Sequence, residues 1–407
     1  MNTRKQILID KYVAKPIAYL FNFVARFLGK ILSIDHNLNK PFKRIVICKY
    51  KGLGSIIQST PMLEALRKKH PNAEIIFVST KSNEHFLKKI DTIHTIVSVD
   101  DKSLFRLLVT LTKAQFYLIK NRPDVYIDLE IYSNFSTLVA LFSLSKNRIG
   151  FYLRDSSFKM GIYTHMMFFN PRVPISEVYL QVARLFGEIN TPAQLYPIDK
   201  NISVKNDFLP QQKYIIINPN ASDLRIERRW DALNFKMLIE QLLVHYKDYL
   251  LVLIGSKSEK EYTHSITQNI KSNRVINTAG ETSIDELIAL IKNADLVITN
   301  DTGPMHISFA CKTPTVCLFG PCSPSQYGSA ENASIIYKNV YCSPCVHDFN
   351  IPPCGGDNVC MKLIELDEVL VAVENQLKSS SKIANTQSIE TKFTTNNKVM
   401  GLVNRTA

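Results

Sequence analysis

The feature that most constrains the fold is a repeated alternation between short apolar runs and longer segments with helical spacing. It occurs twice, on either side of a polar stretch at Asn201–Gln212 where the periodicity lapses. Strands that alternate with helices predict a parallel, doubly wound sheet, so we expect an α/β protein with two such domains. The expected strands are Arg44–Cys48, Glu74–Ser79, Thr95–Val99, Asp124–Leu129 and Arg148–Tyr152 in the first half, and Tyr214–Asn218, Leu250–Ile254, Arg274–Asn277, Asp295–Thr299 and Pro314–Phe319 in the second.

The alternation divides the chain into regions. Ser283 followed by Glu286 predicts a capping box at the start of one helix of the second half. A helical pattern at Leu363–Leu377 predicts a closing helix, and the Ser, Thr, Asn and Lys that follow predict disorder. The expected regions are an N-terminal helix region at 1–40, Rossmann-like domains at 41–205 and 206–378, and a disordered tail at 379–407.

The segment Lys15–Ile34 predicts an amphipathic helix, with a polar stripe of Asn22, Arg26 and Lys30. Its uncharged part, Pro16–Ala25, is shorter than the roughly 20 apolar residues that cross a bilayer. Two placements stay open: the helix lies flat on a membrane, or it packs on the protein's own surface. No secretory signal is recognisable, so we expect a cytoplasmic protein, peripheral on the inner membrane.

The chain is strongly basic, with 49 Lys and Arg against 36 Asp and Glu, and a net charge of +13. Such a charge favours an anionic partner, which leaves a phospholipid surface, a phosphorylated glycolipid and nucleic acid, or a solvated surface without a partner. Nucleic acid is disfavoured because no basic helix with interleaved aromatic residues and no known binding module is found.

The most informative segment for chemistry is Asp295–Gly320, where an apolar strand leads directly into Asn300, Asp301, Thr302 and Gly303. Pro304 suits the first turn of the following helix, where a missing N–H costs nothing. A strand-to-helix turn presents backbone N–H groups and a positive dipole end to a diphosphate, and Asp301 is suited to sugar or ribose hydroxyls. The alternative is a plain capped helix with no ligand.

Three further stretches accompany this segment in order: KGLGSIIQSTPMLEAL at Lys51–Leu66, INPNASDLRIERRW at Ile217–Trp230 and VLIGSKSEKE at Val252–Glu261. Together they resemble the bacterial ADP-heptose:lipopolysaccharide heptosyltransferase family, glycosyltransferase family 9, over roughly residues 43–375. The resemblance implies a GT-B fold, in which two Rossmann-like doubly wound domains face one another across a cleft. It also implies an inverting transferase that requires no metal cofactor.

The resemblance further implies the partners and their binding residues. The donor is a nucleotide-diphosphate sugar, ADP-heptose by family default, bound by the second domain, and the acceptor is a lipopolysaccharide core or other glycolipid, bound by the first. Arg228 pairs with the diphosphate, assisted by Arg229, and Glu259 binds the ribose. The loop residues implied beside the donor phosphates and sugar are Asn218, Asn220, Ala221, Ser222, Asp301, Thr302, Gly303, Pro304, Met305 and His306.

One position departs from the family pattern. Ser55 follows Gly54 where members of the family commonly carry an aspartate that is thought to deprotonate the acceptor. A serine hydroxyl is not ionised near neutral pH without an activating partner. We therefore expect Glu130, or its neighbour Asp128, to replace this base at the end of a strand of the first sheet. The alternatives are that Glu130 only caps the helix near Ser133, and that the chain is a catalytically silent nucleotide-sugar-binding protein.

The eight cysteines do not predict a disulfide framework, because cytosolic thiols stay reduced. Cys342, Cys345, Cys354 and Cys360 are nevertheless clustered. Four thiols predict a possible tetrahedral structural zinc site, although the second pair is spaced more widely than in usual zinc ribbons.

Overall fold

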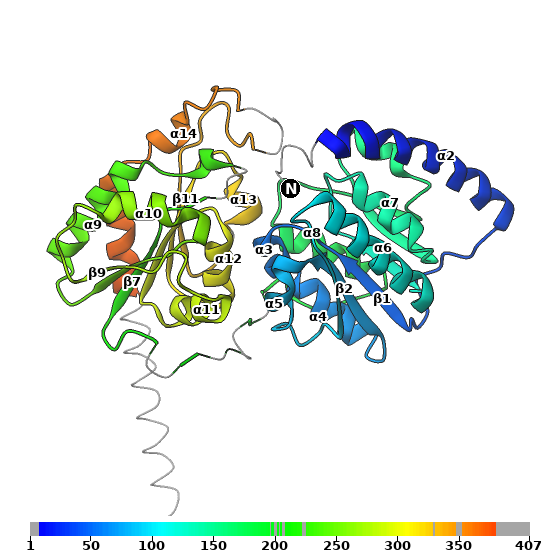
Figure 1. Cartoon of the computed structure of the whole chain (residues 1–407), viewed down its shortest axis with the longest axis horizontal. Helices are drawn as coiled ribbons and strands as arrows, with labels where there is room; N and C mark the ends of the chain where they lie inside the picture. Colours follow the sequence, from blue (N-terminus) through cyan, green and yellow to red (C-terminus); the bar gives the residue numbers. More distant parts are fainter. Residues whose placement is uncertain are drawn as a thin grey trace, which may run out of the picture. The chain divides into compact units, whose positions relative to one another are not determined.

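The computed structural model describes residues 8–195, 197–198, 202, 204–205, 208–221, 225–328, 330–346 and 352–379. The chain divides into two compact units (Figure 1). Unit 1 comprises residues up to Ile202 together with Ser325–Tyr327, and unit 2 comprises the remainder. Each unit is a parallel sheet covered by helices, which confirms the predicted α/β class. The predicted tail at 379–407 lies outside the described residues from position 380 onward.

Unit 1 is built on a six-stranded parallel sheet with the order β3-β2-β1-β4-β5-β6. The central strands are almost wholly apolar because helices cover both faces of the sheet. Val46, Ile76 and Tyr126 belong to the resulting core. The strands are β1 (Arg44–Cys48), β2 (Glu74–Thr80), β3 (Thr95–Val99), β4 (Val125–Asp128), β5 (Asn147–Tyr152) and β6 (His165–Phe168).

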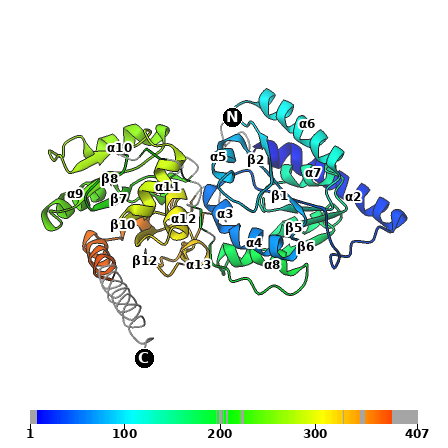
Figure 2. The ribbon, with the colours of Figure 1, turned by 90° about the horizontal axis from the view of Figure 1, so that it is seen from below.

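The helices of unit 1 lie in two layers. Figure 2 shows α2, α6 and α7 on one side of the sheet, with α4 and α8 on the other. Packing between α7 and both α2 and α6, and between α4 and α8, agrees with this arrangement. The helices are α2 (Lys15–Leu32), α3 (Leu53–Gln58), α4 (Thr60–Lys69), α5 (Glu84–Leu87), α6 (Leu104–Asn121), α7 (Phe135–Phe142) and α8 (Ile175–Arg184), with short helical turns η1 (Asp10–Ala14), η2 (Lys81–Asn83) and η3 (Arg154–Lys159).

Unit 2 repeats this architecture with a six-stranded parallel sheet in the order β12-β11-β10-β7-β8-β9. Its strands are β7 (Tyr214–Asn218), β8 (Leu250–Leu253), β9 (Val275–Asn277), β10 (Leu296–Asn300), β11 (Thr315–Phe319) and β12 (Ala333–Tyr337). Its helices are α9 (Ala232–His245), α10 (Lys260–Thr267), α11 (Ile284–Asn293), α12 (Gly303–Ala310), α13 (Pro324–Tyr327) and α14 (Val359–Lys362), with turns η4 (Ile226–Arg228) and η5 (Lys257–Glu259).

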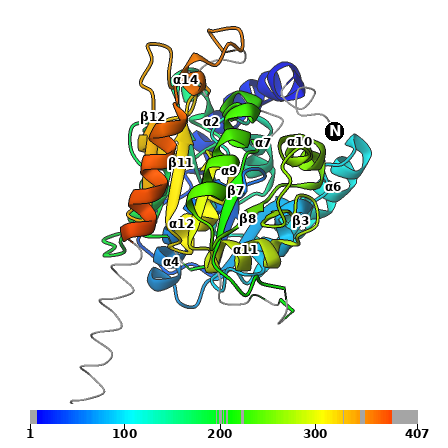
Figure 3. The same ribbon diagram turned by 90° about the vertical axis from the view of Figure 1, so that its left-hand side faces the viewer.

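A last helix occupies residues 366–379 and runs alongside α9 (Figure 3). The predicted helix at Leu363–Leu377 therefore begins later than the pattern indicated. Residues 363–365 connect α14 to this helix, and the Ile364 carbonyl accepts a hydrogen bond from the Trp230 indole at 3.0 Å. Val369 and Val373 join Trp230 in the core of unit 2.

The capping box at α11 is confirmed, because Ser283 and Glu286 exchange their hydrogen bonds as predicted. Two strands, β6 and β12, were not predicted. Both are edge strands, and each follows only a short helical segment, η3 or α13, so the alternation of strands with longer helices does not extend to them.

No helix in the described part of the chain combines the length and the hydropathy that crossing a membrane requires.

Candidate functional site

Both sheets have a topological switch point, where consecutive connections leave in opposite directions. In unit 1 it lies between β1 and β4, and in unit 2 between β7 and β10. Open α/β sheets bind ligands at the carboxyl ends of the strands flanking such a point. The predicted site residues Ser55, Asp128 and Glu130 follow or end β1 and β4, and Asn218 and Asp301 do the same for β7 and β10.

Glu130 lies in the unit 1 switch point and is held on both carboxylate oxygens. Its Oε1 accepts hydrogen bonds from the backbone N–H groups of Tyr50 at 2.7 Å and Lys51 at 3.1 Å. Its Oε2 pairs with the Lys49 ammonium at 3.0 Å. Burial lowers the pKa of Lys49, but Glu130, Tyr179 and Asp128 together more than offset this and leave the pKa raised. Both carboxylate oxygens of Glu130 are thus engaged by groups at the end of β1.

Asp128 lies beneath this cluster and is only 1% exposed. Its Oδ2 accepts a hydrogen bond from the Tyr163 hydroxyl at 2.6 Å, and its Oδ1 accepts one from the Glu130 backbone N–H at 2.9 Å. Burial raises the pKa of Asp128 to about 6, although both hydrogen bonds act in the opposite direction. An enclosed carboxyl of this kind supports the loop that carries Glu130.

Ser55 lies in the first turn of α3, whose preceding residue Gly52 has φ of +87°. That backbone conformation favours glycine, since a side chain there is strained. Ser55 interacts with the hydroxyl of Tyr179, which is buried. Burial raises the pKa of Tyr179, on which the charges of Lys49 and Glu130 also act. The structure thus places Ser55 in the same cluster as the predicted substitute for its missing carboxylate.

In unit 2, Asn218 ends β7 and links the strands on either side of the switch point. Its Nδ2 donates to the Thr299 hydroxyl at 2.8 Å and to the Thr302 hydroxyl at 2.7 Å. Thr302 is the extended N-cap residue of α12, so this contact fixes the entry into the helix. Because Asn218 is buried, it supports the turn from beneath.

Asn220 has a similar supporting position and is also buried. Its Nδ2 donates to the Ile254 backbone carbonyl at 2.7 Å. Its backbone carbonyl accepts a hydrogen bond from the Asn300 Nδ2 at 3.1 Å. A Cβ at Gly255 would lie 2.7 Å from the Asn220 Nδ2, so only glycine leaves room for this side chain. The neighbouring predicted residue, Ser222, lies outside the described residues.

Arg228 ends the turn η4 and extends toward the start of α12. Its Nη1 lies 3.5 Å from the Asp301 Oδ2 and 3.4 Å from the Asp301 carbonyl oxygen. The Arg228 side chain keeps 22% of its surface exposed, whereas that of Asp301 keeps 5%. Asp301 is therefore placed to orient the guanidinium, while Arg228 is the member of the pair that solvent reaches.

Arg229 has a different environment from its neighbour. Its guanidinium lies 4.2 Å from the ring centroid of Tyr262, and its Nη2 donates to the Ala221 carbonyl at 3.0 Å. These contacts hold the loop that follows β7. Glu259 likewise has a local role, because its Oε2 accepts hydrogen bonds from the backbone N–H and the hydroxyl of Ser256 in a capping box.

Helix α12 begins at Gly303, and Thr302, Gly303 and Pro304 remain partly exposed. Its first-turn N–H groups give this end a partial positive charge. Met305 and His306 are buried behind it. Burial lowers the pKa of His306 to about 4, with Asp301 and Arg228 acting in opposite directions. His306 is therefore neutral near pH 7 and leaves the positive charge of this turn to Arg228 and the helix end.

Burial raises the pKa of Cys360 to about 11, and Cys345, Cys342 and Cys354 act in the same direction. In the described part of the chain, however, no group of three or more His, Cys, Asp and Glu side chains is placed to hold a metal ion. The predicted zinc site receives no geometric support and stays a prediction.

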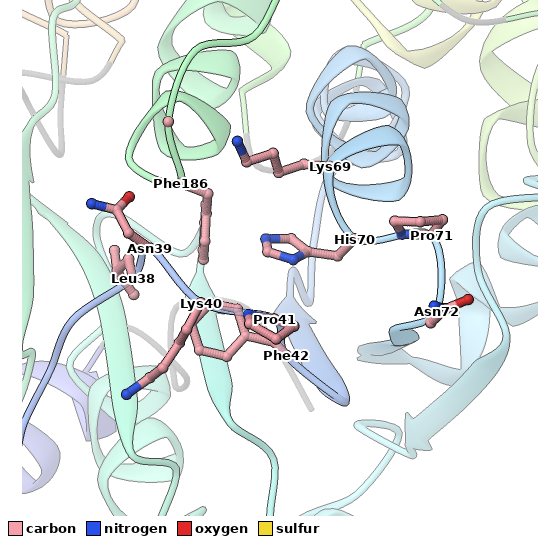
Figure 4. Close-up of a pocket in the computed structure, with 11 residues that line it drawn as sticks. Leu38, Asn39, Lys40, Pro41, Phe42, Lys69, His70, Pro71, Asn72 and Phe186 are labelled. Carbon is pink, nitrogen blue, oxygen red and sulfur yellow. The ribbon is translucent and has the colours of Figure 1, made fainter.

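The pocket drawn in Figure 4, of about 380 Å³, lies away from these residues. It is bounded by the segment before β1 and the ends of α4 and α8, at the opposite end of the unit 1 sheet from the switch-point loops. The rings of Phe42, His70 and Phe186 turn toward one another there, with centroids 5.3–5.8 Å apart. This end of a parallel sheet is not where its ligands bind.

The sequence misses several residues that shape the site: Lys49, Tyr163, Tyr179 and Tyr262. Lys49 directly follows a predicted strand, a position that could have identified it. Tyr179 lies in α8, Tyr262 in α10 and Tyr163 between η3 and β6, so they reach the switch points only through folding.

Comparison with known proteins agrees with this geometry. Residues 121–354 match the model of glycosyltransferase family 9 (heptosyltransferase), which is more than half of the chain. Lipooligosaccharide heptosyltransferase 2 of Campylobacter jejuni is 26% identical over 338 residues, covering 81% of this chain and 96% of that protein.

Solved structures show the same fold. The structure of E. coli ADP-heptose LPS heptosyltransferase II has a TM-score of 0.66 at 21% identity, covering 83% of this chain and 99% of that one. E. coli heptosyltransferase WaaC with ADP has a TM-score of 0.62 at 14% identity, covering 82% and 99%. With two switch points occupied by the motifs of one family, the chain belongs to glycosyltransferase family 9 and is a glycosyltransferase of the heptosyltransferase type with a GT-B fold.

Proposed function

We propose that this enzyme transfers a sugar, heptose by the family default, from a nucleotide-diphosphate donor to a lipopolysaccharide core or related glycolipid. The observation that supports this most directly is the partly exposed Arg228, oriented by Asp301 beside the N-terminus of α12. A guanidinium and a helix N-terminus together suit a diphosphate. The similarity to a heptosyltransferase solved with ADP favours ADP as the nucleotide.

In this proposal the donor occupies the carboxyl end of the unit 2 sheet. Arg228 and the first N–H groups of α12 stabilise the negative charge that develops on the departing nucleoside diphosphate. Arg229 and Asn220 support the loop next to the phosphates, and the Glu259 carboxylate faces the ribose. Transfer proceeds with inversion at the anomeric carbon, and protein cations take the place of a divalent metal ion.

The acceptor hydroxyl requires a base in unit 1, and we assign this role to Glu130. Asp128 is too buried to touch an acceptor, whereas 14% of the Glu130 side chain is exposed. An acceptor that displaces the Lys49 ammonium would free the Glu130 Oε2 to accept the proton. Lys49 would then remain close enough to stabilise the acceptor's developing charge.

The substitution of Glu130 by Gln tests this role. We expect the rate of transfer to fall by about 10²–10⁴-fold with little change in donor affinity, because a general base contributes that much to a transition state. The matched variant Glu177→Gln removes a carboxylate that pairs with Arg184 on the surface of α8, and should leave the rate unchanged. Equal rates for Glu130→Gln and the unmodified enzyme would exclude Glu130 as the base.

A catalytically silent nucleotide-sugar-binding protein is the second candidate, favoured by Ser55 and by the engaged oxygens of Glu130. Thermal shift against ADP, GDP and UDP identifies the donor nucleotide, since a ligand at 100 times its Kd stabilises a protein by about 2.7 kcal/mol. Incubation with the matching nucleotide sugar and a delipidated lipopolysaccharide acceptor then separates the two. Nucleotide release with acceptor glycosylation supports the enzyme, and tight donor binding without turnover supports the silent protein.

The acceptor of the proposed reaction is a glycolipid, so we also assign the protein a peripheral position at the inner face of the membrane. A structural metal at the four clustered cysteines is tested by elemental analysis of the purified chain, and no step of the proposed reaction depends on it.

A further inference from the structure

Helix α2 is attached to unit 1 through its polar side. Asn22 is buried, and its Oδ1 accepts a hydrogen bond from the Ile162 backbone N–H at 3.2 Å. One turn further on, the Arg26 Nε donates to the Met160 carbonyl at 2.6 Å. Ala18, four residues before Asn22, is also buried. Positions spaced by four lie on one side of a helix, so the side carrying Asn22 and Arg26 faces the protein.

The residues before α2 hold it in this orientation. The Asp10 carboxylate accepts hydrogen bonds from the backbone N–H groups of Asn134 and Phe135, both at 2.8 Å, at the start of α7. A carboxylate at a helix N-terminus satisfies free N–H groups and the helix dipole. Tyr19 adds a stacked contact with Phe158, with ring centroids 3.8 Å apart.

The opposite side of α2 is apolar and exposed. It comprises Leu20, Phe23, Val24, Phe27 and Ile31, which have helical i, i+3, i+4 spacing. Phe23 is 72% exposed. A surface helix of a soluble protein usually buries its apolar stripe and exposes its polar side. Helix α2 does the reverse, and its 18 residues carry the stripe over about 27 Å.

Helix α6 carries a second exposed apolar stripe. The side of α6 that faces the protein buries Ala114 and Leu118. The opposite side carries large apolar residues, of which Phe105 is 76% exposed. Both helices pack against α7 and cover the same side of the unit 1 sheet (Figure 2). The exposed residues of this stripe are Phe105, Leu108, Val109, Phe116 and Ile119.

The charge of the two helices is of one sign. Residues 11–34 contain Lys11, Lys15, Arg26 and Lys30 and no Asp or Glu. Residues 102–123 contain Lys102, Arg106, Lys113, Lys120 and Arg122, again without an acidic residue. Arg106 pairs with Asp100 at 3.6 Å, and the remaining basic residues give both helices a net positive charge.

We propose that the exposed sides of α2 and α6 form one docking surface, which lies flat on a bilayer rich in anionic phospholipid. The proposal deepens the proposed function, on which it rests for its link to a glycolipid acceptor. Apolar side chains at the acyl boundary with basic residues among the headgroups are the composition of an interfacial helix. Neither helix is apolar enough to span, so the surface rests on the membrane.

The partner we infer is lipid rather than protein because of this charge distribution. A protein interface of high affinity depletes Lys and is specified by paired polar groups. Here Lys30, Lys113 and Lys120 are exposed next to the apolar stripes. Flexible lysines keep their ammonium groups in the headgroup region while their stems follow the apolar surface.

Vesicle flotation with the full chain tests the proposal, using phosphatidylethanolamine vesicles with and without phosphatidylglycerol. We expect binding to the anionic vesicles that weakens at high salt. The double variants Phe23→Ser/Phe27→Ser on α2 and Phe105→Ser/Phe116→Ser on α6 should each lose at least about tenfold in affinity. The control Val244→Ser/Val371→Ser removes equally exposed apolar residues from unit 2 and should bind like the unmodified chain.

Three results would overturn the proposal: no binding of the unmodified chain to anionic vesicles, unchanged binding by both double variants, or a dimer in light scattering that the α2 variant abolishes. The same assays distinguish a failure of the docking surface from a failure of the proposed function. If the docking surface alone is impaired, the variants still glycosylate a delipidated acceptor and lose activity only on acceptor embedded in vesicles. If the proposed function fails, transfer is absent with both acceptors while vesicle binding persists.

Discussion

The pair Arg228 and Asp301 allows a sharp test of the donor site that we propose at the start of α12. If Asp301 acts by orienting Arg228, its carboxylate matters only while the guanidinium is present. The two charged groups lie 3.5 Å apart, which corresponds to a gross attraction of about 5 kcal/mol at an effective dielectric constant of about 20. Desolvation offsets much of this, so we expect a coupling of about 1–3 kcal/mol between the two positions.

The perturbations are Arg228→Gln, Asp301→Asn and the double variant. Arg228→Gln should reduce kcat/KM by about 10²–10³-fold, as for the loss of one preorganised donor to a developing anion. Asp301→Asn should reduce it by about tenfold to a hundredfold through misplacement of the guanidinium, a loss equivalent to the expected coupling. The double variant should be no slower than Arg228→Gln alone.

The assay is release of nucleoside diphosphate from the donor, with donor Kd measured by calorimetry. Arg184→Gln, which removes an arginine paired with Glu177 at 3.6 Å on α8, is the matched control and should be unaffected. Strict additivity of the two changes would refute the reasoning, because it would mean that Asp301 contacts the donor directly. Unchanged turnover in Arg228→Gln would refute the cationic donor site itself.

Three further predictions concern stability and the missing carboxylate. The pKa of His306 is about 4 in the folded chain, below the value of about 6.5 in the unfolded chain. Its contribution to the free energy of unfolding is therefore present above pH 6.5 and is lost as the pH falls toward 4. Relative to His306→Gln, the unmodified chain should lose about 3 kcal/mol of unfolding free energy over that range in urea titrations, and parallel pH profiles would contradict this. Gly255→Ala should lower the unfolding free energy by about 1–3 kcal/mol and weaken donor binding, since its Cβ meets the Asn220 Nδ2 at 2.7 Å; an unchanged Tm would show that the loop adapts. Ser55→Asp should raise the transfer rate and make Glu130→Gln less damaging, whereas a rate that falls in this variant would show that the Tyr179 contact outweighs a new base.

Much of the fold was predictable from local pattern. The central strands of both sheets are buried on both faces, so their sequences are continuous apolar runs that indicate a strand without reference to any partner. The edge strands β6 and β12 were not predicted because each follows only a short helical segment, η3 or α13, which interrupts the strand–helix alternation. Pro61, in the first turn of α4, separates this helix from α3, since it lacks an N–H for the helical ladder.

The site was predictable only as a set of positions. Motifs following β7 and β10 identified the turn that we propose binds the donor, because parallel strands bring their carboxyl ends to one edge. The roles within that turn depended on burial. Asn218 and Asn220 support the backbone from beneath, and Asp301 is enclosed beside Arg228, because side chains from elements distant in sequence fill the space around them.

The N-terminal helix shows the division between sequence and structure most clearly. Its sequence determined that Lys15–Leu32 is amphipathic, with basic residues and no acidic ones, and periodicity alone suffices for that. Periodicity does not say which side of a helix faces the protein, since that depends on the groups it meets. Only the tertiary structure decided it: the Ile162 N–H and the Met160 carbonyl take Asn22 and Arg26 inward, and the apolar stripe is left facing outward.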